Sequence, residues 1–114
     1  MAKYSVRKRG DFGQFISHIR NEIANGSVSA SLEEFHEMRM DRVRCAVMVF
    51  ERYSFMGKNR LSLNITVIEE NNNLGIIAAT SGGSQAIFFK INTIGEDAFL
   101  KKAIEAIDSF SWQK

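Results

Sequence analysis

The sequence contains no proline and a single cysteine, Cys45, among its 114 residues. One cysteine excludes an internal disulfide framework, and its place in an apolar run indicates an inert buried thiol rather than a nucleophile. No run of about 18 apolar residues occurs, so we expect no transmembrane helix. The N-terminus from Met1 to Arg7 has no apolar stretch long enough for a signal peptide. These absences predict one cytoplasmic domain over residues 1–114, built from regular elements.

The chain also lacks a large excess of charge of one sign. It has 15 Lys and Arg against 13 Asp and Glu, so its formal net charge is only +2. One short basic cluster stands at the N-terminus: Lys3, Arg7, Lys8 and Arg9. A nucleic-acid-binding chain usually carries a denser basic stripe with interleaved aromatic residues. We therefore interpret this cluster as a solvated terminus and expect neither a nucleic-acid partner nor a membrane partner.

Two segments have the periodicity of amphipathic helices. Asp11 with Gln14, and Thr93 with Glu96, have the spacing of capping boxes that begin a helix. Asn25-Gly26 is typical of a helix end, where glycine adopts the left-handed conformation. Trp112 follows the second helix and is expected to pack back onto it. The apolar stripes are Phe12, Phe15, Ile16, Ile19 and Ile23 in the first helix, and Phe99, Ala103, Ile107 and Phe110 in the second.

Alternating apolar and polar residues predict strands at residues 3–8, 28–32, 42–53 and 61–67, and the runs at residues 74–79 and 86–91 read as two further strands on either side of the glycine loop at residues 80–85. The alternation breaks at Glu33-Glu34, where the strand bulges or stops, and residues 33–41 read as a charged connection. Short turns between successive strands make the sheet antiparallel. The expected fold is an α+β two-layer sandwich, with a largely antiparallel sheet of about six strands and two helices on one face. A more curved sheet wrapped around the last helix is the alternative.

The long strand at residues 42–53 has an unusual second face. Met48 and Phe50 share the parity of Arg52, and we place them with Ser62 and Asn64 on the face without helices. Such a face should be mostly polar, and Met48, Phe50 and Ile77, together with Phe89 if the glycine loop keeps the parity, are too apolar for it. A second copy of the chain is the simplest cover, which predicts a homodimer with Met48 and Phe50 at its interface. A bound ligand with an arginine partner, or a solvated face with scattered apolar residues, remains open.

The segment Thr80–Gln85 is the strongest candidate for a binding site. Adjacent glycines reach backbone angles that other residues avoid, so backbone N–H groups could converge there on a small anionic or polar ligand. Arg52 or Arg60 would supply the charge. A plain turn between strands is the competing interpretation, because Gly and Ser are common in turns. The ligand-binding candidates are Ser81, Gly82, Gly83, Ser84, Gln85, Arg52 and Arg60.

Other chemistry has weaker support. His36 lies among Glu33, Glu34, Glu37 and Asp41, but the spacing matches no recognised metal-ligand pattern, and a solvated acidic loop is the default. His18 falls at the exposed flank of its helix. Ser81 and Ser84 lack the nucleophile-elbow pattern. We expect no metal and no cofactor. An enzyme of unidentified reaction type ranks third, after a non-enzymatic homo-oligomeric module and a ligand-binding module.

Residues 51–64 and 80–93, together with residues 43–47, resemble a family of small uncharacterised bacterial proteins, a domain of unknown function. The resemblance covers nearly the whole chain and implies a compact cytosolic protein. It implies no activity and assigns no role to any residue.

Overall fold

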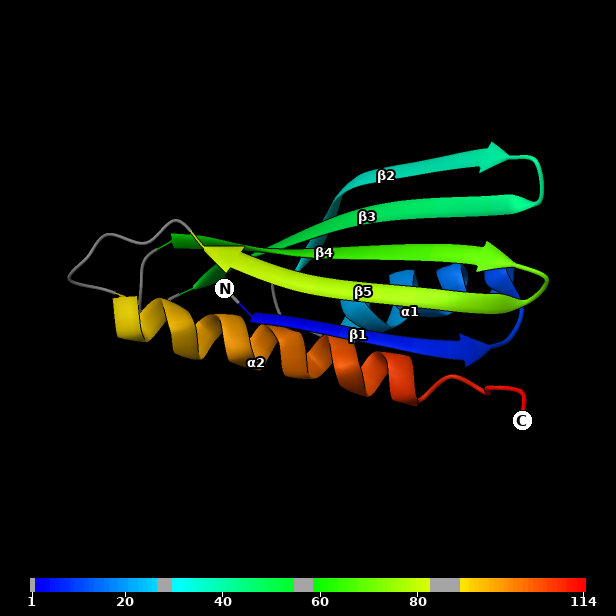
Figure 1. Cartoon of the computed structure of the whole chain (residues 1–114). Coiled ribbons are helices and arrows are strands. Elements are labelled where there is room, and N and C mark those ends of the chain that lie inside the picture. Colours follow the sequence, from blue (N-terminus) through cyan, green and yellow to red (C-terminus); the bar gives the residue numbers. More distant parts are fainter. Residues whose placement is uncertain (1, 27–29, 55–58, 83–88) are drawn as a thin grey trace.

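The computed structural model describes residues 2–26, 30–54, 59–82 and 89–114 (Figure 1). Its elements follow one another as β1 (Ala2–Arg9), α1 (Phe12–Gly26), β2 (Ser31–Met40), β3 (Val43–Ser54), β4 (Asn59–Glu70), β5 (Asn73–Gly82) and α2 (Phe89–Asp108). The five strands form one sheet in the order β1-β5-β4-β3-β2. Every neighbouring pair is antiparallel. The predicted α+β class with an antiparallel sheet is confirmed.

Both helices pack on the same face of this sheet. The core joins the predicted stripes of α1 and α2 to the inward residues of the central strands, and these inward residues include Met48, Phe50, Leu63 and Ile65. Figure 1 shows α1 behind the strands, while α2 runs along the β1 side of the sheet. The opposite face of the sheet carries no helix of the described chain, so the molecule has two layers.

Local interactions and backbone conformations explain where several helices and strands begin and end. The amide of Gln14 donates to Asp11 Oδ2 at 2.8 Å, which confirms the predicted cap of α1. Asn71 and Asn72, with φ of 56° and 62°, turn the chain between β4 and β5. Asparagine tolerates this left-handed region better than most residues, which suits a two-residue hairpin. Gly26 ends α1, but no described glycine has a positive φ, so the predicted left-handed cap is wrong.

The predicted sixth strand at residues 86–91 is wrong where the structure describes it, because α2 begins at Phe89. The predicted start of this helix at Thr93 is late for the same reason. Residues 86–88 lie outside the described residues. A short apolar run has no periodicity that separates a strand from a helix, which explains the error. The sheet of the described chain therefore has five strands.

The predicted connection at residues 33–41 is also a misassignment, because β2 continues through Met40. The pairing between β2 and β3 shifts register between Leu32 and Glu34, so the predicted bulge is present. After the bulge, Glu34, His36, Met38 and Met40 share one face. The many charged residues led to the interpretation of this strand as a connection. Charged side chains are nevertheless typical of an edge strand such as β2, where they discourage further pairing.

Candidate functional site

The face of the sheet that the helices leave uncovered differs from the expected one. Met48 pairs with Ile65 and Phe50 pairs with Leu63, and all four side chains are 0% exposed under the helices. The expectation that Met48 and Phe50 lie on the helix-free face is wrong. Because paired residues share a face, the cross-strand register between β3 and β4 decides this assignment.

The other parity of β3 occupies the helix-free face instead. Val43, Cys45, Val47 and Val49 form a continuous half-buried row there. Exposed apolar side chains surround this row. They are Met38 (67% exposed) and Met40 (69%) on β2, Ile68 (43%) on β4 and Ile77 (47%) on β5. We call these eight residues, together with Gly75 and Ala79 of β5 and the half-buried Asn64 and Thr66 of β4, the open face.

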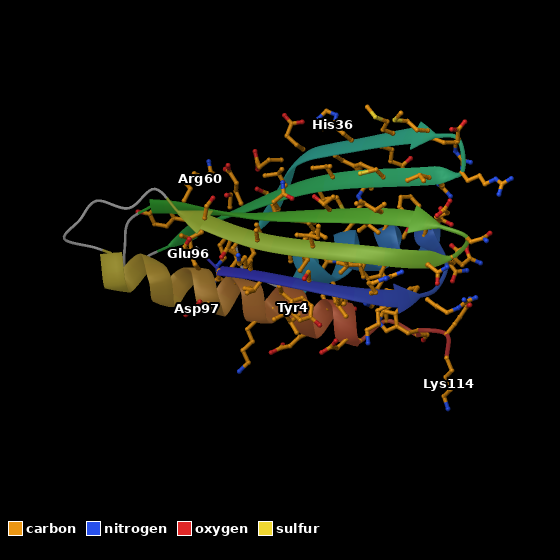
Figure 2. The ribbon with its side chains drawn as sticks, viewed as in Figure 1. Tyr4, His36, Arg60, Glu96, Asp97 and Lys114 are labelled. Atoms are coloured by element: carbon orange, nitrogen blue, oxygen red, sulfur yellow. The ribbon has the colours of Figure 1, made fainter. Side chains whose placement is uncertain are left out.

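Charged side chains flank the open face on its two outer strands. Lys3, Arg7 and Arg9 are exposed on β1. On β2, Glu34 lies 3.1 Å from Nε2 of His36, and both side chains are exposed. Figure 2 shows His36 on the outermost strand, away from β1. The face is thus basic along the β1 edge, and its β2 edge carries a single carboxylate, Glu34, beside His36 and the exposed Met38 and Met40.

Residues of the proposed glycine cradle are only partly described. Ser81 lies opposite Ser62, and their Oγ atoms are 2.7 Å apart in a hydrogen bond. Gly82 pairs with Leu61 as the last residue of β5. Gly83, Ser84 and Gln85 lie outside the described residues.

The two candidate arginines stand at the same end of the sheet but on opposite faces. Arg52 pairs with Leu61 and points toward the helices, with its Cζ 4.8 Å from the centroid of the Phe99 ring. Burial lowers the pKa of the Arg52 guanidinium below its ordinary value. Arg60 pairs with Tyr53, and its Nε lies 3.4 Å from Glu51 Oε1.

Arg60 therefore shares the helix-free face with Ser81, whereas Arg52 does not. In Figure 2, Arg60 and Glu96 lie at the end of the molecule where α2 begins. Ser81 pairs with Ser62, which lies two residues after Arg60 on β4. Arg60 and Ser81 are therefore diagonal neighbours on adjacent strands. The ligand site stays a prediction, and its charge would come from Arg60.

Histidine and cysteine chemistry is limited in the part of the chain that the structure describes. No group of three or more His, Cys, Asp or Glu side chains there could hold a metal ion. His18 connects the helices, because its Nε2 is 2.8 Å from the Ala106 carbonyl and 2.9 Å from Ser109 Oγ. Cys45 is half-buried on the open face rather than enclosed in the core, so the expectation of a buried thiol is wrong.

The exposed methionines of β2 are the part of the open face that the sequence reading missed. A signal was present, because Glu34, His36, Met38 and Met40 alternate with Phe35, Glu37 and Arg39. The set that contains Glu34 and His36 ends in two methionines, whereas the other set ends in Glu37 and Arg39. In the structure, the set with the methionines faces away from the helices. The pairs Met38–Cys45 and Met40–Val43 join it to the valine row of β3.

The fold and this face define a small α+β protein whose antiparallel sheet is covered by helices on one side only. The chain belongs to the family of unknown function DUF6054, whose family model matches residues 1–111. No curated protein matches the sequence. Within the described chain, neither helix has the length and apolar character needed to cross a membrane.

Proposed function

We propose that the protein is a non-enzymatic homodimeric module that associates through the open face of its sheet. The observation that supports this proposal is the group of apolar side chains on β2, β3, β4 and β5 of that face, which lies beside the polar Asn64 and Thr66 of the central strand. Met38, Met40, Ile68 and Ile77 are large apolar side chains that are each more than two-fifths exposed. Contiguous apolar patches of this kind mark interaction surfaces, whereas single exposed apolar residues do not.

The dimensions of the face suit a stable dimer. Five strands spaced about 4.8 Å apart and eight residues of about 3.4 Å each give a face of roughly 24 by 27 Å. Two such faces in contact would bury about 1,300 Å² in total, which lies within the range of specific protein interfaces. Two sheets packed face to face are also a common architecture in single domains.

Sedimentation equilibrium tests the proposal directly. We expect the wild-type chain to be a dimer in the micromolar range and Ile77→Glu to be a monomer, because a carboxylate would be buried at the centre of the interface. Ile77 is 47% exposed in the single chain, so this variant should keep the fold. Far-UV circular dichroism would verify that it does.

Ala24→Glu is the matched control, because it adds the same charge on an exposed position of α1. It should leave the dimer intact. A monomeric wild-type chain would overturn the proposal, and so would an Ile77→Glu dimer as tight as the wild type.

A binding site for a small anionic or polar ligand at the Arg60 end of the sheet is the second candidate. It is supported by the register that places Arg60 diagonal to Ser81 on one face. Calorimetric titration with inorganic phosphate tests it. Arg60→Ala should abolish binding, while Arg42→Ala, at an exposed turn at the far end of β3, should not. Absence of heat with the wild-type chain would remove phosphate as a ligand.

We further propose that the protein is bacterial, as the family resemblance implies, and that it works in the cytoplasm. The support is the single cysteine, which provides no intramolecular disulfide for an oxidising compartment. Enzymatic activity is not part of this proposal, because the sequence offers no signature of acid/base or nucleophilic catalysis.

A further inference from the structure

The arrangement of charge on the open face carries information about how two copies would meet. Lys3 on β1 and Glu34 on β2 stand at the two ends of one row across the sheet. This row runs Lys3–Ala79–Asn64–Val49–Glu34, each residue directly paired with the next. Five strands at about 4.8 Å place the two ends roughly 19 Å apart. Lys3 and Glu34 are therefore too distant to pair within one copy.

Two closed arrangements keep the strands of facing sheets aligned. A two-fold axis parallel to the strands, above the central strand β4, places β1 of each copy over β2 of the other. A two-fold axis across the strands places β1 over β1 and β2 over β2. Both arrangements are isologous, so each uses the same face on both copies.

The charges distinguish these two arrangements. An axis across the strands would stack the basic edges, with Lys3 of one copy opposite Arg9 of the other. An axis along the strands instead places Lys3 of one copy over Glu34 of its partner, because both residues belong to the same row. Facing sheets are about 10 Å apart, a gap that lysine and glutamate side chains reach across from opposite sides.

The apolar residues of β3 and β5 also fit the arrangement with the axis along the strands. It places β5 of one copy over β3 of the other. Ile77 and Val47 share a row through Thr66, so Ile77 would lie over Val47 of the second copy. In the next row, Gly75 would lie over Cys45, so a position without a side chain meets a larger one.

Resting on the proposed homodimer, we infer that its two-fold axis runs parallel to the strands, so that Lys3 of β1 covers Glu34, the one carboxylate of β2 on this face, in the second copy. The recognition element is a pair of symmetry-related Lys3–Glu34 contacts at the rim. Rim charges of this kind fix orientation and register more than affinity.

Charge reversal tests the inference at low salt. Lys3→Glu and Glu34→Lys should each raise the dimer dissociation constant about tenfold, and the double variant should return it to near the wild-type value. In about 1 M salt, where the screening length is about 3 Å, the single variants should match the wild type. Both side chains are exposed, so the fold should persist in every variant.

A two-fold axis across the strands predicts different dissociation constants for these variants. With an axis across the strands, Lys3→Glu would face Arg9 and tighten the dimer, which would overturn the inference. A dimer dissociation constant that neither charge reversal changes would overturn the inference as well. A monomeric wild-type chain would instead remove the proposed function itself.

Chemical cross-linking gives a second measurement that does not depend on affinity. Ser5 and His36 share a row, so the inferred axis brings Ser5 of one copy over His36 of the other. We combine Ser5→Cys in one chain and His36→Cys in another, each with Cys45→Ala, and add a short bismaleimide. The mixture should give a covalent dimer, and neither chain alone should. A Ser5→Cys chain that links to itself would contradict the inferred axis.

Discussion

Gly82 lies directly opposite Leu61, and a Cβ built on Gly82 would stand 2.6 Å from Cδ2 of Leu61. Leu61 is 0% exposed, so its side chain has little space into which to retreat. Gly82→Ala should therefore lower the free energy of unfolding by about 1–3 kcal/mol, the usual cost of overpacking a core. Urea unfolding followed by the fluorescence of Trp112 would measure this loss.

Gly26→Ala is the control for that prediction. A Cβ at Gly26 would meet nothing within 4 Å, and the residue has no positive φ. Its substitution should change the unfolding free energy by less than about 0.5 kcal/mol. If Gly82→Ala were as harmless as Gly26→Ala, the close approach to Leu61 would have no energetic consequence.

The neighbours Phe50 and Val49 should respond differently to truncation because they face opposite sides of the sheet. Phe50→Ala should cost about 3–5 kcal/mol, since it opens a cavity among fully buried side chains. Val49→Ala removes a half-buried side chain from the open face and should cost about 1 kcal/mol or less. Both variants are best compared with Ile77→Glu present, so that association does not add to stability.

Equal losses from Phe50→Ala and Val49→Ala would contradict the assignment of Phe50 to the core and Val49 to the open face. Urea midpoints together with unchanged slopes would show that the comparison concerns the same unfolding transition.

The face of Phe50 illustrates what the sequence could predict and what it could not. Alternation along residues 42–53 correctly groups Met48 with Phe50 and Val47 with Val49. Both groups are apolar, however, so the composition of β3 does not say which one meets the helices. That depends on register, and a shift of one residue reverses every side chain. The observed register pairs Ser54 with Asn59, and the composition of the two strands does not determine it.

The apolar stripes of both helices were predicted well, but of the predicted caps only the one at the start of α1 is present. Asp11 is a cap in both the sequence pattern and the structure. The candidate site was harder, because it depends on residues that meet only through sheet pairing. Arg52 and Arg60 flank one turn, yet the pairing puts them on opposite faces. Their separation could not be read from spacing along the chain.

The cap of α1 leads to a further prediction. Asp11→Ala removes the acceptor for the Gln14 amide and should lower the free energy of unfolding by about 1 kcal/mol. Asp11→Ser retains a side-chain oxygen at the cap and should recover most of that stability. Equal losses in the two variants would show that the hydrogen bond is not what Asp11 contributes. Thermal unfolding followed by circular dichroism would measure both.

The last prediction concerns the C-terminal tail, which packs back onto the helices as expected. Trp112 Nε1 donates to the Ile107 carbonyl at 2.8 Å, and its ring centroid lies 4.9 Å from Phe15 and 4.7 Å from Phe110. Trp112→Phe keeps an aromatic ring but loses the hydrogen bond, so it should cost about 1 kcal/mol. Trp112→Ala also loses the ring contacts and should cost about 3 kcal/mol, the lower end for a large aromatic residue because Trp112 is only half-buried.

Gln113→Ala is the matched control for the tail, because Gln113 bonds through its backbone. Its amide donates to the Arg9 carbonyl at 2.8 Å, and alanine keeps that amide. The control should therefore have the same free energy of unfolding as the wild type. Circular dichroism should monitor the urea unfolding, because the Trp112 variants lose the tryptophan fluorescence. If Trp112→Ala were as stable as Gln113→Ala, the contacts of Trp112 with Phe15 and Phe110 would contribute nothing to the fold. A graded loss from phenylalanine to alanine would instead separate the hydrogen bond from the packing of the ring.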